Sequence, residues 1–452
     1  MSIETALETV VTLPSRQQSN SAGAVIIDLR VAGPFRFDVA LVGLGYVGLP
    51  TALAFHAAGR KVLGLDVNSA RLTSIRDGAV DLLESDHDRL RRALGRQSLI
   101  LTDDPAGLQL AQTVIIAVPT PVDAHLLPDL TILRQACVSV VARAVPGQVI
   151  ILTSTTYAGC TEEMLVRPLA ERGFTVGQDI YVAFSPERID PGNDLHAHED
   201  VPRVVGGATR ECTRRAIMAL SAYAENLHAV SSPDAAELTK LFENTFRAVN
   251  IALANEFAEI SRALNVDVIE VLEAAATKPY GFMKFMPGPG VGGHCIPCDP
   301  LYLLWQLRRS RLPTPVIEQT MQAIAMRPQR VVERVGEVLS HAGRGINAAR
   351  ILVLGVAYKP DVQDLRESSA LTIMAGLRRL GATVEFHDPL VEVVRLTNGE
   401  VLLSTPDPQH CQADLVIVHT LHQGMDVTWL EDMPLILDTS YRLRDLPQCF
   451  PL

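Results

Sequence analysis

A glycine-rich loop from Pro287 to Pro300 contains the residues best suited to covalent chemistry. Cys295 follows four glycines, and the lack of bulk would let a substrate approach the sulfur closely. A thiolate in such a loop can attack a carbonyl carbon. Cys298 follows three residues later, so a dithiol redox site, half of a zinc site and two small buried side chains remain as alternatives. The loop favours a nucleophilic cysteine over these three.

Polar residues on a continuous helical segment supply groups that suit an oxyanion. Lys240 and Asn244 are four positions apart and Arg247 is three further on, so they share one helical face. The opposite face is an apolar stripe of Leu238, Leu241, Phe242, Val249, Leu253 and Phe257. Taken alone, a polar face of this kind is typical of a solvated surface. A thiol reaction nearby would generate an oxyanion that a cation and an amide can stabilise.

A second glycine pattern, Gly43-Leu-Gly45-Tyr-Val-Gly48, lies between a strand-like run and a helical segment. Gly43 permits a tight turn, Gly45 lets the backbone approach a pyrophosphate, and Gly48 lets helix and strand meet. Asp66 ends the next strand-like run, where its carboxylate would bind a ribose 2′-hydroxyl and repel a 2′-phosphate. This order predicts an NAD site, with glycines that serve only a tight turn as the alternative.

Further polar clusters follow other strand-like runs. Thr153 to Thr155 and Ser185 to Glu187 would lie beyond the carboxyl ends of strands, where doubly wound sheets bind ligands. Gly355 to Lys359 and Asp364 to Arg366 combine a glycine turn with cations. They suggest a second, phosphate-bearing ligand, although a salt-bridged loop is nearly as good an interpretation.

Strand-like and helical segments alternate along two stretches of the chain. The first contains the β-rich runs Asp38–Val42, Lys61–Leu65, Thr113–Val118, Gln148–Leu152 and Ile180–Phe184. The second opens at Arg350 and contains Thr383–Phe386, Leu415–Val418 and Leu435–Leu437. Between them, one helix is predicted over Pro233 to Ala263, with Ser231 and Ser232 as cap candidates. The predicted fold class is α/β, with two Rossmann-like doubly wound domains joined by a long central helix and a helical middle.

Composition restricts the partners of this chain of 452 residues. Acidic side chains exceed basic ones and give a net charge of −11, which argues against a nucleic-acid partner. Seven thinly spread cysteines suit reduced thiols better than a disulfide framework. The N-terminus does not resemble a signal peptide, and no apolar run approaches the ~20 residues of a membrane span. We therefore expect a soluble cytoplasmic protein without a metal or a membrane partner.

Together these motifs resemble the UDP-glucose/GDP-mannose dehydrogenase family, in the right order from about Phe37 to the C-terminus. The resemblance also rests on Val118-Pro-Thr120-Pro and on the spacing from Cys295 to Asp299. The loop before Cys295 is most similar to the branch that oxidises UDP-N-acetylhexosamines. Two departures are Cys298, where Val, Ile or Lys is usual, and the segment from Asp438 to Arg442. They bear on the substrate sugar and base more than on the chemistry.

The resemblance implies a four-electron oxidation of the C6 hydroxyl of a nucleotide-diphosphate hexose to a uronic acid, with two NAD⁺ used in succession. Cys295 would carry a thiohemiacetal and then a thioester, while Lys240 and Asn244 stabilise the oxyanion. Asp299 or Glu187, which the sequence does not rank, would orient the hydrolytic water together with the Thr155 hydroxyl. The expected substrate is of the UDP-N-acetylglucosamine type. UDP- or dTDP-glucose is the alternative, and a two-electron hydroxyacid-type dehydrogenase is less favoured.

The resemblance also assigns binding residues and partners. Expected NAD contacts are Gly43, Gly45, Tyr46, Val47, Gly48, Asp66, Arg71, Thr120, Thr155 and Arg366. Expected substrate contacts are Glu187, Lys240, Asn244, Arg247, Phe285, Gly292, Lys359 and Arg442. The expected segments are an arm (1–36), an NAD-binding domain (37–232), a central helical and dimerisation domain (233–345) and a nucleotide-sugar-binding domain (346–452). The long helix is expected to pair with its twin in a homodimer.

Overall fold

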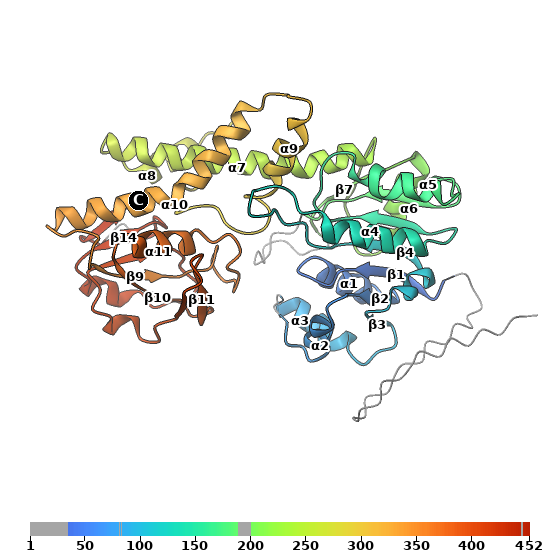
Figure 1. Cartoon of the computed structure of the whole chain (residues 1–452), viewed down its shortest axis with the longest axis horizontal. Helices are drawn as coiled ribbons and strands as arrows, with labels where there is room; N and C mark the ends of the chain where they lie inside the picture. Colours follow the sequence, from blue (N-terminus) through green and yellow to red (C-terminus); the bar gives the residue numbers. More distant parts are fainter. Residues whose placement is uncertain (1–34, 81, 83, 189–199, 444–445) are drawn as a thin grey trace, which may run out of the picture. The chain divides into compact units, whose positions relative to one another are not determined.

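The computed structural model describes residues 35–80, 82, 84–188, 200–443 and 446–452 (Figure 1). The expected N-terminal arm lies outside the described residues, apart from its last two positions. None of the described helices is both long enough and apolar enough to cross a membrane.

An eight-stranded sheet is formed by the first half of the chain, in the order β3-β2-β1-β4-β5-β6-β7-β8. Its strands are β1 (Phe37–Val42), β2 (Val62–Leu65), β3 (Leu99–Thr102), β4 (Ala111–Ile116), β5 (Val149–Leu152), β6 (Tyr181–Phe184), β7 (Arg203–Gly207) and β8 (Leu227–Val230). All neighbours are parallel except β6 and β7. The strand order reverses between β1 and β4, so their carboxyl ends form the crevice where open α/β sheets bind ligands.

Helices cover both faces of this sheet, as the alternation of strands and helices predicts. They are α1 (Gly48–Ala57), α2 (Ser69–Arg76), α3 (Glu84–Ala93), α4 (Thr131–Arg143), α5 (Arg167–Glu171) and α6 (Arg210–Leu220), with short turns η1 (Pro105–Leu110) and η2 (Glu162–Val166). Successive residues of β1 belong to different hydrophobic clusters, Val39 and Leu41 to one and Ala40 and Val42 to the other. Since side chains alternate across a strand, both faces of the sheet are buried.

A second parallel sheet has the order β10-β9-β13-β14-β15. Its strands are β9 (Arg350–Leu354), β10 (Thr383–His387), β13 (Leu415–Val418), β14 (Ile436–Asp438) and β15 (Cys449–Pro451), with the hairpin β11 (Val393–Arg395) and β12 (Val401–Leu403) beside them. Helix α11 (Ser369–Arg379) and the turns η3 (Pro408–His410) and η4 (Thr428–Asp432) complete this part. The predicted fold class, α/β with Rossmann-like parallel sheets, is confirmed.

The middle of the chain is helical. It contains α7 (Pro233–Ala263), α8 (Val268–Ala276), α9 (Asp299–Arg308) and α10 (Pro315–His341), with irregular chain from 281 to 298. The bounds of α7 are those that the sequence predicts. The Ser232 side chain accepts a hydrogen bond from the Ala235 N–H, and Pro233 occupies the first helical position.

The faces of α7 differ from the expectation. Lys240 is only 8% exposed, whereas Phe242 and Leu253 in the apolar stripe are 67% and 49% exposed. The interpretation of this face as solvated is therefore wrong for Lys240, whereas Asn244 is half-buried and Arg247 is exposed. Elements packed closely on α7 leave room mainly for small residues, and its buried face includes Ala236, Ala248, Ala252, Ala254 and Ala258. Close packing, rather than hydropathy, selects the buried face.

Candidate active site

The first glycine turn has the geometry that a dinucleotide requires. Gly43 has φ of +91°, and a side-chain carbon there would lie 2.5 Å from the Ala117 carbonyl oxygen. At Gly48 such a carbon would lie 1.8 Å from the Gly43 carbonyl oxygen, so glycine is needed where α1 begins. At Gly45 no atom lies within 4 Å of that position. Backbone at Gly45 therefore leaves room for a pyrophosphate at the N-terminus of α1.

Asp66 and Arg71 are tied to the same turn. The Asp66 carboxylate, half-buried after β2, accepts hydrogen bonds from the N–H groups of Leu44 (2.8 Å) and Asn68 (2.9 Å). The Arg71 side chain donates from Nε to the Leu44 carbonyl oxygen (3.0 Å). A carboxylate has about four lone-pair sites, so two remain for ribose hydroxyls. These residues fit an NAD molecule bound across the turn.

Arg366 comes to this turn from the second half of the chain. Its guanidinium lies 4.6 Å from the centre of the Tyr46 ring, and its Nε donates to both carboxylate oxygens of Asp364 at 3.0 Å. The structure therefore brings together two residues expected near NAD, Tyr46 and Arg366, although more than three hundred positions separate them in the chain.

The loops after β4 and β5 meet beside the glycine turn. The Val118 N–H donates to the Ser154 hydroxyl (2.9 Å), which joins the two loops. Thr120 is buried, and its carbonyl oxygen accepts a hydrogen bond from the Tyr302 hydroxyl of α9 (3.0 Å). Thr155, which is half-buried, lies in the second loop. Both loops are thus fixed against the helix that follows the cysteine turn.

Cys295 lies in a turn directly before α9, and its carbonyl oxygen accepts the N–H groups of Cys298 (3.2 Å) and Asp299 (2.8 Å). Its side chain is a free thiol that solvent can reach. Desolvation by the surrounding protein nevertheless raises the pKa of this thiol. The charges that act on it include those of Lys240, Asp299, Arg366 and Arg247; the cations lower the pKa and the carboxylate raises it. Residues from α7, α9 and the C-terminal half therefore surround one sulfur atom.

The glycines before Cys295 have a further use that spacing does not reveal. A side-chain carbon at Gly290 would lie 2.5 Å from Cβ of Ser369, and one at Gly292 would lie 2.5 Å from Cβ of Tyr358. Gly293 has φ of +81°, and its N–H donates to the Arg366 carbonyl oxygen (2.9 Å). These glycines let the cysteine loop pack directly on the segment from 358 to 369.

Lys240 and Asn244 point from the buried face of α7 toward the cysteine turn. Lys240 Nζ donates to the backbone carbonyl of Glu187 (3.0 Å), and Asn244 Nδ2 donates to the Asp299 carboxylate (2.5 Å). Asp299 is 2% exposed. Burial raises the pKa of Asp299 to about 6, although Lys240 and Asn244 oppose the shift. A carboxyl with such a pKa changes its protonation state close to neutral pH.

The other candidate carboxylate, Glu187, has a different environment. It forms a buried ion pair with Arg203 of β7 at 2.6 Å, and it accepts the Arg188 N–H at 2.9 Å. Burial opposes ionisation of Arg203, but Glu187 holds the pKa of the guanidinium above its ordinary value. The Glu187 charge is therefore compensated within the protein.

Four more of the residues expected to contact the substrate form two groups. Phe285 packs edge-on against Phe246 with ring centres 5.9 Å apart, and Arg247 follows Phe246 on an exposed part of α7. Gly292 lies against Tyr358, whose ring centre is 5.9 Å from Lys359 Nζ. Both groups include a residue of the chain that leads to Cys295, Phe285 in the first and Gly292 in the second. Arg442 is exposed after β14, and only the resemblance assigns it to the substrate.

Cys298 differs from Cys295 despite its proximity. It is 4% exposed at the N-cap position of α9, and its thiol is free. Burial and the charges of Glu367 and Asp299 raise the pKa of this thiol to about 12. A protonated, buried thiol is unreactive, so the packing interpretation of Cys298 is favoured.

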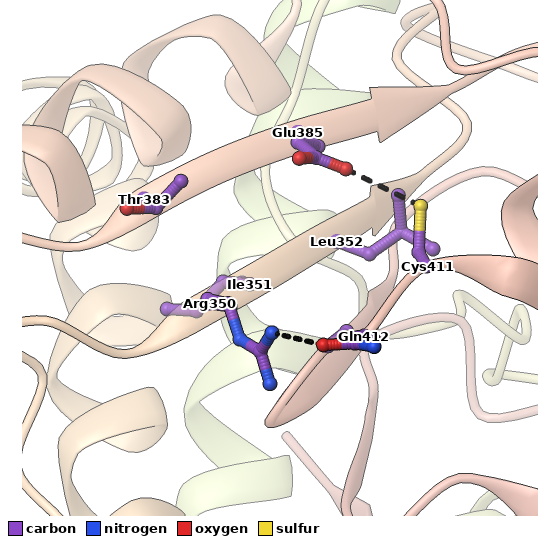
Figure 2. Close-up of a pocket in the computed structure, with 8 residues that line it drawn as sticks. Arg350, Ile351, Leu352, Thr383, Glu385, Cys411 and Gln412 are labelled. Carbon is purple, nitrogen blue, oxygen red and sulfur yellow. Dashed lines mark hydrogen bonds between the residues drawn. The ribbon is translucent and has the colours of Figure 1, made fainter.

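A small cavity of about 120 Å³ lies away from these residues (Figure 2). Its lining includes Arg350 and Thr383 at the amino ends of β9 and β10, and Cys411, whose thiol contacts Glu385 (3.3 Å). Gly355 and Lys359 follow the carboxyl end of β9. The cavity therefore lies at the amino ends of these strands, whereas the expected substrate residues lie at the carboxyl ends.

Comparison with protein families gives matches to three domains of one family. Residues 37–225 match the NAD binding domain of the UDP-glucose/GDP-mannose dehydrogenase family, residues 234–323 its central domain and residues 352–445 its UDP binding domain. These matches include the glycine turn, α7, the cysteine turn and the Lys359 segment. The resemblance seen in the sequence is confirmed.

Comparison with individual proteins gives relatives of the same family. The chain is 34% identical over 414 residues to UDP-N-acetyl-D-glucosamine 6-dehydrogenase of Pseudomonas aeruginosa, which covers 90% of this chain and 96% of that protein. It is 32% identical over 413 residues to UDP-N-acetyl-D-mannosamine dehydrogenase of Yersinia pestis, covering 87% and 96%. A solved UDP-D-ManNAc dehydrogenase from Pyrococcus horikoshii superimposes with a TM-score of 0.81 at 31% identity, covering 89% of this chain and 94% of that one. This chain therefore belongs to the UDP-glucose/GDP-mannose dehydrogenase family and is an NAD-dependent nucleotide-sugar dehydrogenase that acts on a CH–OH group.

Proposed function

We propose that this dehydrogenase oxidises the C6 hydroxyl of a nucleotide-diphosphate hexose twice, to the uronic acid, with Cys295 as the covalent carrier. The observation that carries the proposal is the convergence on one turn of a reachable thiol, the buried Lys240, and Asn244 bonded to Asp299. A two-electron dehydrogenase has no use for a thiol at this position.

Each group has a distinct task. When bound, NAD⁺ supplies the acceptor for the two electrons and the hydrogen removed in each oxidation. After the first oxidation, the Cys295 sulfur bonds to the aldehyde carbon while the carbonyl electron pair moves onto oxygen. Lys240 and Asn244 donate to that oxygen; losing a positioned donor of this kind costs about 3 kcal/mol. The covalent bond retains the aldehyde, and the second oxidation converts the adduct to a thioester.

Hydrolysis of the thioester requires a base, and Asp299 suits this role better than Glu187. The Asp299 carboxylate has an amide partner and a pKa of about 6, whereas the charge of Glu187 is compensated by Arg203. Ionised Asp299 takes a proton from water as the water attacks the thioester carbon, and the Cys295 sulfur leaves with the electron pair. The Thr155 hydroxyl orients the water.

The substrate that we propose is of the UDP-N-acetylglucosamine type, with UDP- or dTDP-glucose as the alternative. Support comes from the match to a UDP binding domain and from the names of the relatives, which act on UDP-N-acetylhexosamines. A solved UDP-glucose dehydrogenase from Pyrobaculum islandicum is also similar, with a TM-score of 0.80 at 26% identity. A panel of UDP-, dTDP- and GDP-hexoses with NADH counted per sugar tests the proposal. Two NADH per UDP-N-acetylhexosamine support it; one NADH per sugar contradicts the covalent route.

We further propose that α7 pairs with its twin in a homodimer in the cytoplasm. The exposed apolar residues of α7 recur at intervals of three, four and seven along one face. They are Leu238, Phe242, Phe246, Leu253, Phe257, Ile260 and, just after the helix, Leu264. Light scattering on the purified protein gives the oligomeric state. A monomer at micromolar concentration would contradict the dimer.

A further inference from the structure

A short segment after the Thr155 loop is bonded by side chains of two helices. The buried carboxylate of Glu237, on α7, accepts the N–H of Gly159 (2.6 Å), the N–H of Thr161 (2.8 Å) and the hydroxyl of Thr161 (2.6 Å). Gln306, on α9, accepts the N–H of Ala158 (3.2 Å) and donates to its carbonyl oxygen (2.7 Å). We call this arrangement the 158–161 clamp.

The two helices of the clamp also carry reactive groups of the site. Glu237 precedes Lys240 by three positions and Asn244 by seven, so all three lie on one face of α7, where Glu237 and Lys240 are buried and Asn244 is half-buried. Gln306 follows Asp299 by seven positions, which is two turns of α9. The loop between β5 and the clamp contains Thr155. The clamp thus joins this loop to the elements that present Lys240, Asn244 and Asp299.

The chemistry of Glu237 is specific to a carboxylate. All three of its partners are donors, and two are N–H groups at the start of a helical segment, where negative charge is stabilised. Burial raises the pKa of Glu237, although the bonds from Thr161 and Gly159 oppose the shift. An amide in its place would turn an NH₂ group toward donors and leave buried N–H groups unpaired.

We propose that Glu237 and Gln306 are positioning residues that hold the Thr155 hydroxyl in register with the thioester on Cys295. This inference rests on the proposed function, because Thr155 has this task only if a thioester is hydrolysed. The clamp bonds the Thr155 side of the site and not the cysteine turn itself. Its loss should therefore slow hydrolysis more than either oxidation.

The test compares Glu237→Gln with Glu171→Gln, a matched control at an exposed position at the end of α5. In Glu237→Gln we expect kcat to fall roughly 10- to 100-fold, as for a misplaced catalytic group. Rapid mixing should show a burst approaching two NADH per subunit, and intact mass should show a uronyl adduct on the protein. Glu171→Gln should match the parent. A variant that loses the burst together with kcat, or that matches Glu171→Gln, would overturn the inference.

Two further variants separate positioning from a general loss of stability. Gln306→Leu removes the other half of the clamp and should give the same burst with a smaller decrease in kcat, so the conclusion does not depend on Glu237→Gln folding. A double-mutant cycle of Gln306→Leu with Thr155→Ala should be non-additive, because both changes act through one hydroxyl. Additive effects would mean that the clamp is merely structural. If the parent itself yields one NADH per sugar, the proposed function fails, whatever the clamp variants do.

Discussion

The two large sheets contain the same local arrangement, a glycine turn followed by an aspartate, but the aspartate has different partners in each. In each, a glycine with positive φ follows the first strand, Gly43 at +91° and Gly355 at +75°, and an aspartate follows the neighbouring strand. Asp66 accepts a backbone N–H of its turn and remains half-exposed. Asp388 accepts two N–H groups of its turn, those of Val356 and Ala357, and is 3% exposed.

A histidine accounts for the difference. His422 Nδ1 accepts the Asp361 N–H (2.9 Å), so its Nε2 carries the hydrogen and donates to Asp388 (3.2 Å). The carboxylate at Asp388 is therefore satisfied within the protein, whereas that at Asp66 has capacity left for a ribose. A glycine turn followed by an acid is thus not sufficient to identify a dinucleotide site. For the C-terminal half, we therefore propose that ligand contacts come from side chains after the turn, such as Lys359.

Two other pairs of like residues also differ in how far the surrounding protein leaves the reactive group available. Glu187 is compensated by Arg203, whereas Asp299 has an amide partner; Cys298 is buried, whereas Cys295 is reachable. In each pair, the group that the surrounding protein leaves chemically available is the one to which we assign a role. Substituting each member of a pair separately therefore tests that assignment.

Among the paired groups, the largest effect is expected at the two carboxylates. Asp299→Asn should slow thioester hydrolysis by about 10²- to 10⁴-fold at neutral pH, because a general base is lost. In the parent enzyme, hydrolysis should fall as the pH decreases through about 6, where Asp299 becomes protonated. Single-turnover rates between pH 5 and pH 8, measured with the preformed adduct, give this profile. A profile that persists in Asp299→Asn and disappears in Glu187→Gln would reverse the assignment.

A smaller effect is expected at the first glycine turn. Asp66→Asn removes the charge that binds the ribose and repels a 2′-phosphate, so the ratio of kcat/KM for NAD to that for NADP should fall about 10- to 100-fold. Asp388→Asn, the matched change in the other sheet, should leave this ratio unaltered. Equal kcat/KM for the two cofactors in the parent enzyme would show that Asp66 does not face the ribose.

Protein stability, in contrast, should depend on Asp388. Asp388→Asn should lower the free energy of unfolding by about 1–3 kcal/mol, because buried N–H groups lose a charged acceptor. Although burial opposes the shift, the bonds from His422 and the backbone hold the pKa of Asp388 below its ordinary value. This stabilisation should be present above the pKa of an unfolded aspartate and be lost as the pH falls through the lower, folded value. Thermal melting at several pH values measures it; an unchanged melting profile would mean that Asp388 is not needed internally.

The smallest effect is expected at Cys298. Cys298→Val fills the same apolar space, so activity in reducing buffer should change by less than about twofold. Inactivation by mild oxidant and recovery with dithiothreitol should be the same in this variant as in the parent. If the reversible component disappears in Cys298→Val, a regulatory disulfide with Cys295 replaces the packing interpretation.

Local signals in the sequence identify much of this molecule. The glycine turn, Asp66 and the bounds of α7 can be predicted because each depends on residues close together in the chain. The predicted strand-like runs do not include β3, β7, β8, β11, β12 or β15. Length alone does not explain this, because β2, β5 and β6 have only four residues each and are predicted. The burial of Lys240 was also missed, since close packing around α7 overrides its hydrophobic pattern.

Pairings between distant residues account for the rest. Arg203 of β7 compensates Glu187, which is 16 positions earlier in the chain. His422 contacts Asp388 from 34 positions away, and Glu237 accepts hydrogen bonds from Thr161 across 76 positions. None of these pairs has a spacing that marks it in the sequence. They determine which acidic groups are available, so the choice between Asp299 and Glu187 needed the structure.

The covalent role of Cys295 has the most direct test. In Cys295→Ser and Cys295→Ala, NADH and uronic acid are measured against the parent with a UDP-N-acetylhexosamine. We expect no net acid, with at most a slow first oxidation, because removal of the C6 hydrogen does not need sulfur. Turnover to the uronic acid at a rate near that of the parent would contradict the covalent mechanism.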